Sequence, residues 1–80
     1  MSVQANIHSN AKIGKGTIVE PFATINNDVI IGENCWIGIG TKIIENIKIG
    51  NNVFIGAGSV VTKNIKSNSF VMGVPAKNAK

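Results

Sequence analysis

Residues 30–65 read IIGENCWIGIGTKIIENIKIGNNVFIGAGSVVTKNI, and an isoleucine or valine recurs in this stretch at every sixth position. Extended in both directions, the repeat covers eleven units, from Met1 to Lys66, without an insertion. The first positions of these units are Met1, Ile7, Ile13, Val19, Ile25, Ile31, Ile37, Ile43, Ile49, Ile55 and Val61. The fifth positions are Ala5, Ala11, Thr17, Ala23, Val29, Cys35, Thr41, Ile47, Val53, Ser59 and Ile65. A repeat this short predicts a solenoid.

A period of six fits neither a regular helix nor a regular strand. An amphipathic helix repeats its apolar residues every three or four positions, and a half-buried strand alternates. Two inward residues four positions apart, followed by a bend, suit a short strand that turns a corner. Corners often need positive φ, which Gly, Asn and Asp tolerate best. The fourth position carries such residues at Asn10, Gly16, Asp28, Asn34, Gly40, Asn46, Asn52, Gly58 and Asn64, and only Gln4 and Phe22 depart.

A second period, of eighteen residues, lies above the first. The segments KIGKGTIVEPFATINNDV, IIGENCWIGIGTKIIENI and KIGNNVFIGAGSVVTKNI, residues 12–29, 30–47 and 48–65, align without gaps. Three hexads therefore make one coil, and strands of successive coils pair in parallel. We predict an all-β fold, a parallel β-helix of triangular section with about three and two-thirds coils over residues 1–66.

Residues 67–80 leave the repeat, and we expect them to form a C-terminal cap or tail. Gly73 and Pro75 indicate a turn. The segment FVM, residues 70–72, together with Val74, is apolar enough to lie on the open end of the prism. A tail that reaches a neighbouring subunit is equally compatible with the sequence.

Composition limits the classes of function. The 80 residues allow one domain, and without a cationic leader or a long apolar run we expect a soluble, cytoplasmic protein with no membrane partner. The single cysteine, Cys35, holds a fifth position, so we expect a buried thiol and no metal site. The net charge of +4 comes from lysines alone. Without arginine forks, we expect no binding of nucleic acid.

The sixth positions point outward, and one stacked column of them forms an outer ladder of Ile18, Trp36 and Phe54. A contiguous exposed apolar column predicts burial against another chain or a ligand. A flat-faced prism associates most economically around a closed symmetry axis, so we predict a homotrimer through this face. Alternatively, the aromatic side chains of this column only cover a corner of their own prism and contact no other chain or ligand. Both ends of the solenoid are strand edges, which also favours end-to-end strand pairing.

The blocks WIG, GAGSVVTK and GVPAK, within residues 36–65 and 73–77, resemble the carboxy-terminal coils of the hexapeptide-repeat acetyltransferases. The resemblance is closest to the branch that acetylates sialic acids and bacterial aminosugars. It implies left-handed β-helices that form a homotrimer, with acetyl-CoA in a groove between neighbouring prisms. It also implies the residues that would line that groove. Those flanking the pantetheine arm would be Trp36, Gly38, Gly56, Ala57, Gly58 and Ser59, while Thr62, Lys63 and Lys77 would lie toward the nucleotide.

The resemblance does not extend to a catalytic base. In this family a histidine takes a proton from the acceptor amine or hydroxyl. The single histidine, His8, lies in NIHSNAKIG, which does not match the motif of the family base, so it is a weak candidate and we expect no catalytic residue. Family members also have more coils between the segments that resemble VIIGENC and WIGIG, whereas here Cys35 directly precedes Trp36. We therefore expect a truncated acetyltransferase-like domain that acts, if at all, on a sugar.

Two alternatives remain open from the sequence. The chain is either a natural remnant of such an enzyme or an engineered minimal β-helix, a structural scaffold that self-associates without catalysis. A third reading, weaker than these, is a small adaptor that binds another protein through the outer ladder.

Overall fold

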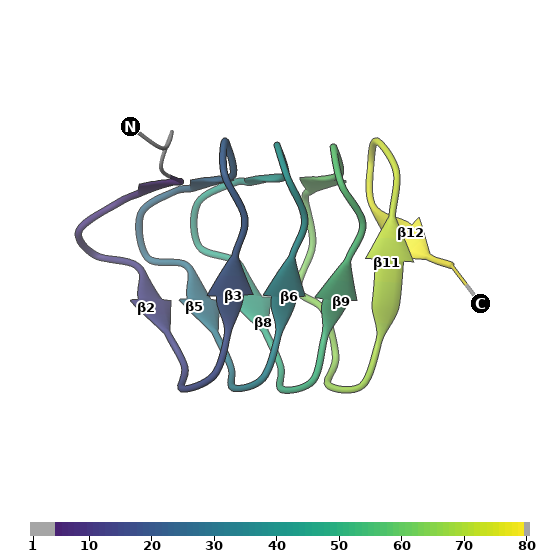
Figure 1. Ribbon diagram of the computed structural model, residues 1–80, viewed down its shortest axis with the longest axis horizontal. Helices are drawn as coiled ribbons and strands as arrows, with labels where there is room; N and C mark the ends of the chain where they lie inside the picture. Colours follow the sequence, from purple (N-terminus) through teal and green to yellow (C-terminus); the bar gives the residue numbers. More distant parts are fainter. Residues whose placement is uncertain (1–4, 80) are drawn as a thin grey trace.

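The computed structural model describes residues 5–79, so the expectations for Met1, Gln4 and Lys80 lie outside the described residues. Short strands follow one another around a prism (Figure 1). They are β1 (Asn6–Ile7), β2 (Lys12–Ile13), β3 (Ile18–Val19), β4 (Thr24–Ile25), β5 (Ile30–Ile31), β6 (Trp36–Ile37), β7 (Lys42–Ile43), β8 (Lys48–Ile49), β9 (Phe54–Ile55), β10 (Val60–Val61), β11 (Phe70–Met72) and β12 (Lys77–Asn78). No helix in this part of the chain is long and apolar enough to cross a membrane.

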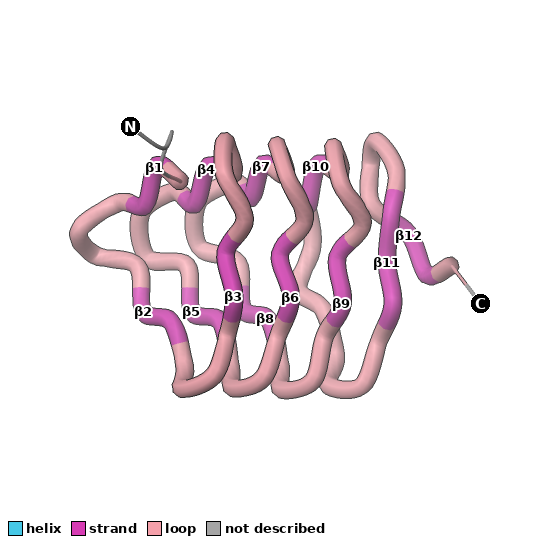
Figure 2. The backbone as a smooth tube through the Cα atoms, viewed as in Figure 1, coloured by secondary structure: helices cyan, strands magenta, loops and turns pink. Residues whose placement is uncertain are grey.

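The strands form three sheets, one on each face of the prism (Figure 2). Face A has the order β1-β4-β7-β10, face B has β2-β5-β8, and face C has β3-β6-β9-β11-β12. Partners such as Thr24 and Lys42 lie eighteen residues apart, which confirms three hexads to a coil. Four parallel strands on faces A and C give about four coils.

The prism is a left-handed parallel β-helix, as expected. In Figure 1 the coils advance from the N-terminus at the left to the C-terminus at the right, while the near strands β3, β6 and β9 run upward, which is the left-handed sense. Parallel crossovers elsewhere are almost always right-handed.

The first and fifth positions fill the interior, as the hexad pattern predicts. Ile37, Ile43 and Ile55 are fully buried, and Cys35 is only 2% exposed. Ile7, in the first coil, is 41% exposed because described residues cover its layer on one side only. Each layer of a solenoid is buried by its neighbours, so the end layers stay open.

Most of the fourth positions have positive φ, which confirms the prediction made from their residue types. The predicted residues with positive φ are Gly16, Asp28, Asn34, Gly40, Asn46, Asn52 and Gly58. The prediction is wrong at Asn10 and Asn64, which do not adopt it, and Asn68 adopts it instead. Phe22 is not a residue that favours positive φ, yet it occupies a fourth position and has a φ of 66°. Positive φ is unfavourable for a bulky L-residue, so the fold imposes this conformation on Phe22.

The uninterrupted register predicted through Lys66 breaks in the last coil. Ile65 pairs with Ile49, and Val71 pairs with Ile55, so the spacing falls from eighteen residues to sixteen. Ile65 therefore occupies a first position rather than the predicted fifth. The parallel coils also continue past Lys66, because β11 extends face C.

Beyond β11 the chain turns at Gly73, which has a φ of 104°, and β12 returns antiparallel along β11. Ala76 packs against the core, and its amide donates to the carbonyl of Val60 at 2.8 Å. The expected cap therefore divides into two parts. Residues 70–72 complete a coil, and residues 73–79 fold over its end.

Candidate functional site

The outer ladder lies along face C, and the structure extends it by one residue. The rings of Trp36 and Phe54 stack with centroids 4.4 Å apart, and Phe70 meets Phe54 edge to face at 4.9 Å. The indole Nε1 of Trp36 donates to Glu20 Oε2 at 2.9 Å. These contacts fix the indole ring, since aromatic pairs and a charge-assisted hydrogen bond each resist its rotation.

The corner between faces C and A, here called the C–A corner, comprises residues 20–23, 38–41, 56–59 and 72–75. Nine large apolar side chains of the described residues are exposed, and six of them lie on face C or at this corner. The six are Ile18, Phe22, Ile39, Phe54, Met72 and Val74. Exposed apolar surface is therefore concentrated on one side of the prism, as a binding face requires.

Three of the expected cofactor-binding glycines at the C–A corner differ in their surroundings. A Cβ on Gly38 would lie 2.6 Å from the amide nitrogen of Ala57, so stacking of the coils already requires glycine there. A Cβ on Gly56 would meet Met72 Cβ at 3.0 Å and Met72 Cε at 3.3 Å. A Cβ on Gly58 would meet nothing within 4 Å, although its φ of 73° favours glycine. Of these three glycines, only Gly58 combines an absent side chain with open space.

Ala57 and Ser59 lie on either side of Gly58, and their side chains differ in accessibility. Ala57 is an exposed residue of the C–A corner with only a methyl side chain. Ser59 is fully buried, and its hydroxyl donates to Gly56 O at 2.6 Å and accepts from Gly73 N at 3.2 Å. The Ser59 side chain is therefore engaged inside the prism, and only its backbone could approach a ligand.

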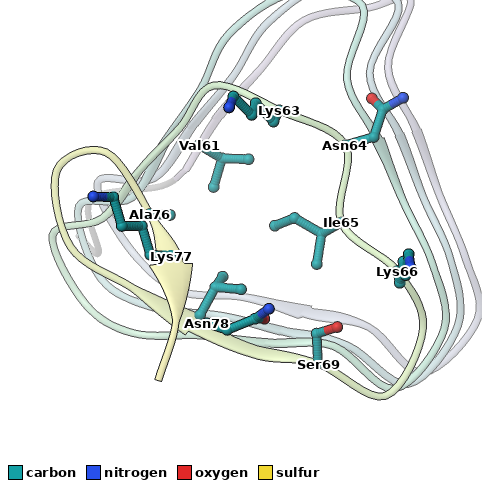
Figure 3. Close-up of a pocket in the computed structure, with 10 residues that line it drawn as sticks. Val61, Lys63, Asn64, Ile65, Lys66, Ser69, Ala76, Lys77 and Asn78 are labelled. Carbon is teal, nitrogen blue, oxygen red and sulfur yellow. The ribbon is translucent and has the colours of Figure 1, made fainter. Parts of the chain in front are cut away.

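The residues expected toward the nucleotide lie near the C-terminal end. Thr62 and Lys63 are exposed at the corner that follows β10, and Lys77 lies on β12 beside Met72. A cavity of about 390 Å³ opens at this end of the prism. Figure 3 shows Lys77, Lys63 and Lys66 at three separate places around the opening. Lysines thus surround the end of the solenoid, although Lys63 and Lys77 do not lie on the outer ladder.

His8 lies apart from these residues. It is exposed at the corner that follows β1, in the first coil, and its Nδ1 accepts from the Asn10 amide at 3.2 Å. The structure therefore does not bring His8 together with the C–A corner of the third and fourth coils. Among the described residues, no group of three or more His, Cys, Asp or Glu side chains is arranged to hold a metal ion.

Sequence reasoning missed four residues of this face. Phe70 and Met72 were expected on the open end of the prism, and that placement is wrong because the shortened last coil brings β11 onto face C beside β9. Glu20 precedes Pro21 at the corner that also contains Phe22, and nothing in the sequence pairs its carboxylate with the Trp36 indole. Phe22 stood out as an exception to the corner column, and this irregularity was the available signal.

Comparisons with known proteins agree with this geometry. Residues 28–63 match the family model described as bacterial transferase hexapeptide (six repeats). Serine acetyltransferase from Neisseria gonorrhoeae is 27% identical, with a TM-score of 0.72, and the match covers 95% of this chain and 41% of that protein. A serine acetyltransferase solved in complex with CoA is 32% identical, with a TM-score of 0.61, and the match covers 94% and 41%. No curated protein sequence matches the chain.

A third solved structure shares the fold at lower identity. It is PerB from Caulobacter crescentus, in complex with CoA and GDP-perosamine, at 21% identity and a TM-score of 0.58, with 99% of this chain and 58% of that protein covered. The chain therefore spans between 41% and 58% of the length of these solved proteins. Together, the hexapeptide match and the two serine acetyltransferases confirm the expected resemblance to hexapeptide-repeat acetyltransferases and support an acyltransferase-like β-helix.

Proposed function

We propose that this chain is a CoA-binding β-helix of the acetyltransferase type, whose parent activity is transfer of an acetyl group from acetyl-CoA to a sugar. One observation carries the proposal. The outer ladder, in which Ile18 and Phe54 are exposed, lies beside a corner where Ala57 and Gly58 are exposed and Gly58 faces open space. An extended, partly apolar ligand needs this combination of apolar wall and accessible peptide groups.

The residues present fit the pantetheine arm of CoA. Ala57 and Gly58 are exposed and have small or absent side chains, with open space beside Gly58, and Trp36 with Phe54 forms an apolar wall on the neighbouring face. Gly56 does not add open backbone, because it is buried and Met72 Cβ, which does not move with the rotamer, lies beside it. When bound, acetyl-CoA supplies a thioester as the acyl donor.

The charged part of the cofactor requires cations. Lys63 and Lys77 lie at the C-terminal end of the prism, and lysine suits phosphate as a mobile point charge. Thr62, exposed beside Lys63, adds a hydroxyl. These three residues would hold the nucleotide, while the C–A corner holds the arm.

The described residues support binding better than turnover. Acetyl transfer to an amine or hydroxyl needs a general base within hydrogen-bond reach of the acceptor. His8 lies in the first coil at another corner, so we propose that it is not that base and that the base is absent from this chain. We therefore propose a sugar acceptor for the parent activity only and not for this chain.

A groove between neighbouring prisms would complete the site. The outer ladder and the C–A corner carry six of the nine exposed large apolar side chains of the described residues, and a second prism would cover them. We propose a homotrimer, because closed symmetry buries this face on every copy. Sedimentation at micromolar concentration should give the trimer mass. A monomer whose Trp36 is freely quenched by acrylamide would refute it.

Thermal melting with CoA tests the binding proposal. A ligand that binds only the folded state raises the melting temperature, and at a hundredfold excess over Kd the stabilisation is about 2.7 kcal/mol. Ala57→Leu should remove most of this shift, since the larger side chain would cover the open backbone at the corner. Ser9→Leu adds the same side chain at an exposed corner of the first coil and should keep the full shift. No shift in the parent protein at millimolar CoA would overturn the proposal.

A structural scaffold that self-associates is the second candidate. Among the described residues β1, β2 and β3 each pair on one side only, and Ile7 is 41% exposed. The opposite end is less suited to stacking, because β12 runs antiparallel and carries Lys77, features that protect strand edges. Light scattering that rises with concentration, and that falls in Ile7→Pro, would favour this candidate.

A further inference from the structure

The last coil, at the C-terminal end of the prism, is shorter than the coils before it. In the inward fifth-position column that contains Ala11, Val29 and Ile47, the next member should be Ile65, but the sixteen-residue spacing moves Ile65 over Ile49 instead. The backbone shows the same shift. The amides of Lys12 and Ile30 bond to the carbonyls of Val29 and Ile47, whereas the Lys48 amide bonds to the side-chain Oδ1 of Asn64 at 2.8 Å. The last coil therefore has one inward fifth-position side chain fewer than the others. A hollow of about 390 Å³ lies at this end of the prism, and Val61 and Ile65 are among the residues that line it.

The walls and the rim of this hollow differ in character. Val61, Ile65 and Ala76 supply apolar walls, and Figure 3 shows Val61 and Ile65 pointing into the interior. Lys77, Lys63 and Lys66 stand at three separate places around the opening. No Asp or Glu is among the lining residues in the described part of the chain. An apolar interior beneath a cationic rim selects a ligand that has an aliphatic part and a negative charge.

We propose that the hollow is a binding site for a small amphiphilic anion, an aliphatic carboxylate whose chain enters the hollow and whose headgroup meets the lysine rim. The volume lies within the range of small-molecule pockets, roughly 300–1,000 Å³. Insertion of the chain removes apolar surface of Ile65 and Ala76 from water, and both side chains are only partly buried in the free protein. A cationic amphiphile would be repelled by the rim, and a neutral one would leave it unpaired.

This site is separate from the CoA face. The hollow opens along the axis of the prism, whereas the outer ladder and the C–A corner lie on its side. Lys63 and Lys77 are shared with the proposed nucleotide contacts, but Lys66 is not. The inference does not depend on CoA binding, and Lys66 is the residue that distinguishes the two sites.

Titration of the isotope-labelled protein with octanoate tests the site. We expect amide shifts that saturate and that cluster in residues 61–78. Lys66→Gln with Lys77→Gln should weaken octanoate binding about tenfold, as expected for loss of two solvent-exposed charge contacts. The matched control, Lys12→Gln with Lys15→Gln, changes the net charge equally at the other end of the solenoid and should leave the affinity unchanged. Octylammonium should produce no saturable shifts in residues 61–78.

Three results would overturn the proposal. They are equal binding of octylammonium, equal loss of affinity in the control double variant, and shifts confined to the outer ladder. A second variant tests the aliphatic part. Ala76→Leu places a larger side chain at the hollow and should abolish the octanoate shifts, whereas retained binding in a folded Ala76→Leu protein would also contradict the site. The melting shift with CoA in Lys66→Gln should match the parent protein, which separates failure of this site from failure of CoA binding.

Discussion

Gly38→Ala tests whether the C–A corner glycines serve the stacking of the coils or the binding of a ligand. A Cβ on Gly38 would lie 2.6 Å from Ala57 N and 2.8 Å from Ile55 O. Both are backbone atoms of the next coil, and Ile55 O accepts the Gly38 amide at 2.9 Å. The methyl group can fit only if the two coils separate, which weakens this hydrogen bond and the packing beneath it.

The expected loss can be compared with an open corner. Overpacking costs roughly 1–3 kcal/mol, and a weakened hydrogen bond adds about 1 kcal/mol, so Gly38→Ala should lower the unfolding free energy by about 2–4 kcal/mol. Gly58→Ala meets no atom within 4 Å and carries only the strain of its φ of 73°, about 1–2 kcal/mol. Gly38→Ala should therefore be the more damaging change, although Gly58 is the more open position.

Urea unfolding followed by the fluorescence of Trp36, the single tryptophan, measures both losses. An 80-residue domain has a total stability of roughly 4–12 kcal/mol, so Gly38→Ala should shift the midpoint strongly or leave the chain largely unfolded. Equal midpoints for the two variants, or a larger loss in Gly58→Ala, would refute the argument from coil stacking.

Three further changes follow from burial and backbone conformation. Ile37→Ala should cost about 2–5 kcal/mol in urea unfolding because Ile37 is fully buried, whereas the same change at the exposed Ile44 should cost much less; equal losses would contradict the assigned core. Phe22→Asn should raise the melting temperature, by a few degrees for about 1 kcal/mol of relieved strain, and a lower value would show that the 58% exposed ring is packed after all. Cys35 should react with a thiol reagent far more slowly in the native protein than in urea, because it is buried with Sγ 3.1 Å from Gly50 O; rapid native labelling would contradict this.

The sequence alone was sufficient for the prism, because each hexad repeats the same local requirement. An inward aliphatic residue, an inward small or β-branched residue and a corner residue that tolerates positive φ recur in nearly every unit. Interactions between coils then repeat as well, so one eighteen-residue alignment predicts the pairing of every strand up to β10. The outer ladder follows from the same alignment.

The tertiary structure decided the features that break the repeat. Ile65 satisfies a first position as well as a fifth, so the sequence could not show that the last coil is two residues shorter, and only its pairing with Ile49 reveals the shift. The place of Phe70 in the outer ladder and the Asn64 contact depend on that choice. The positive φ of Phe22 is likewise imposed by neighbouring coils against its own preference. Periodic local chemistry specifies the repeat, whereas its exceptions are fixed by contacts between residues far apart in the chain.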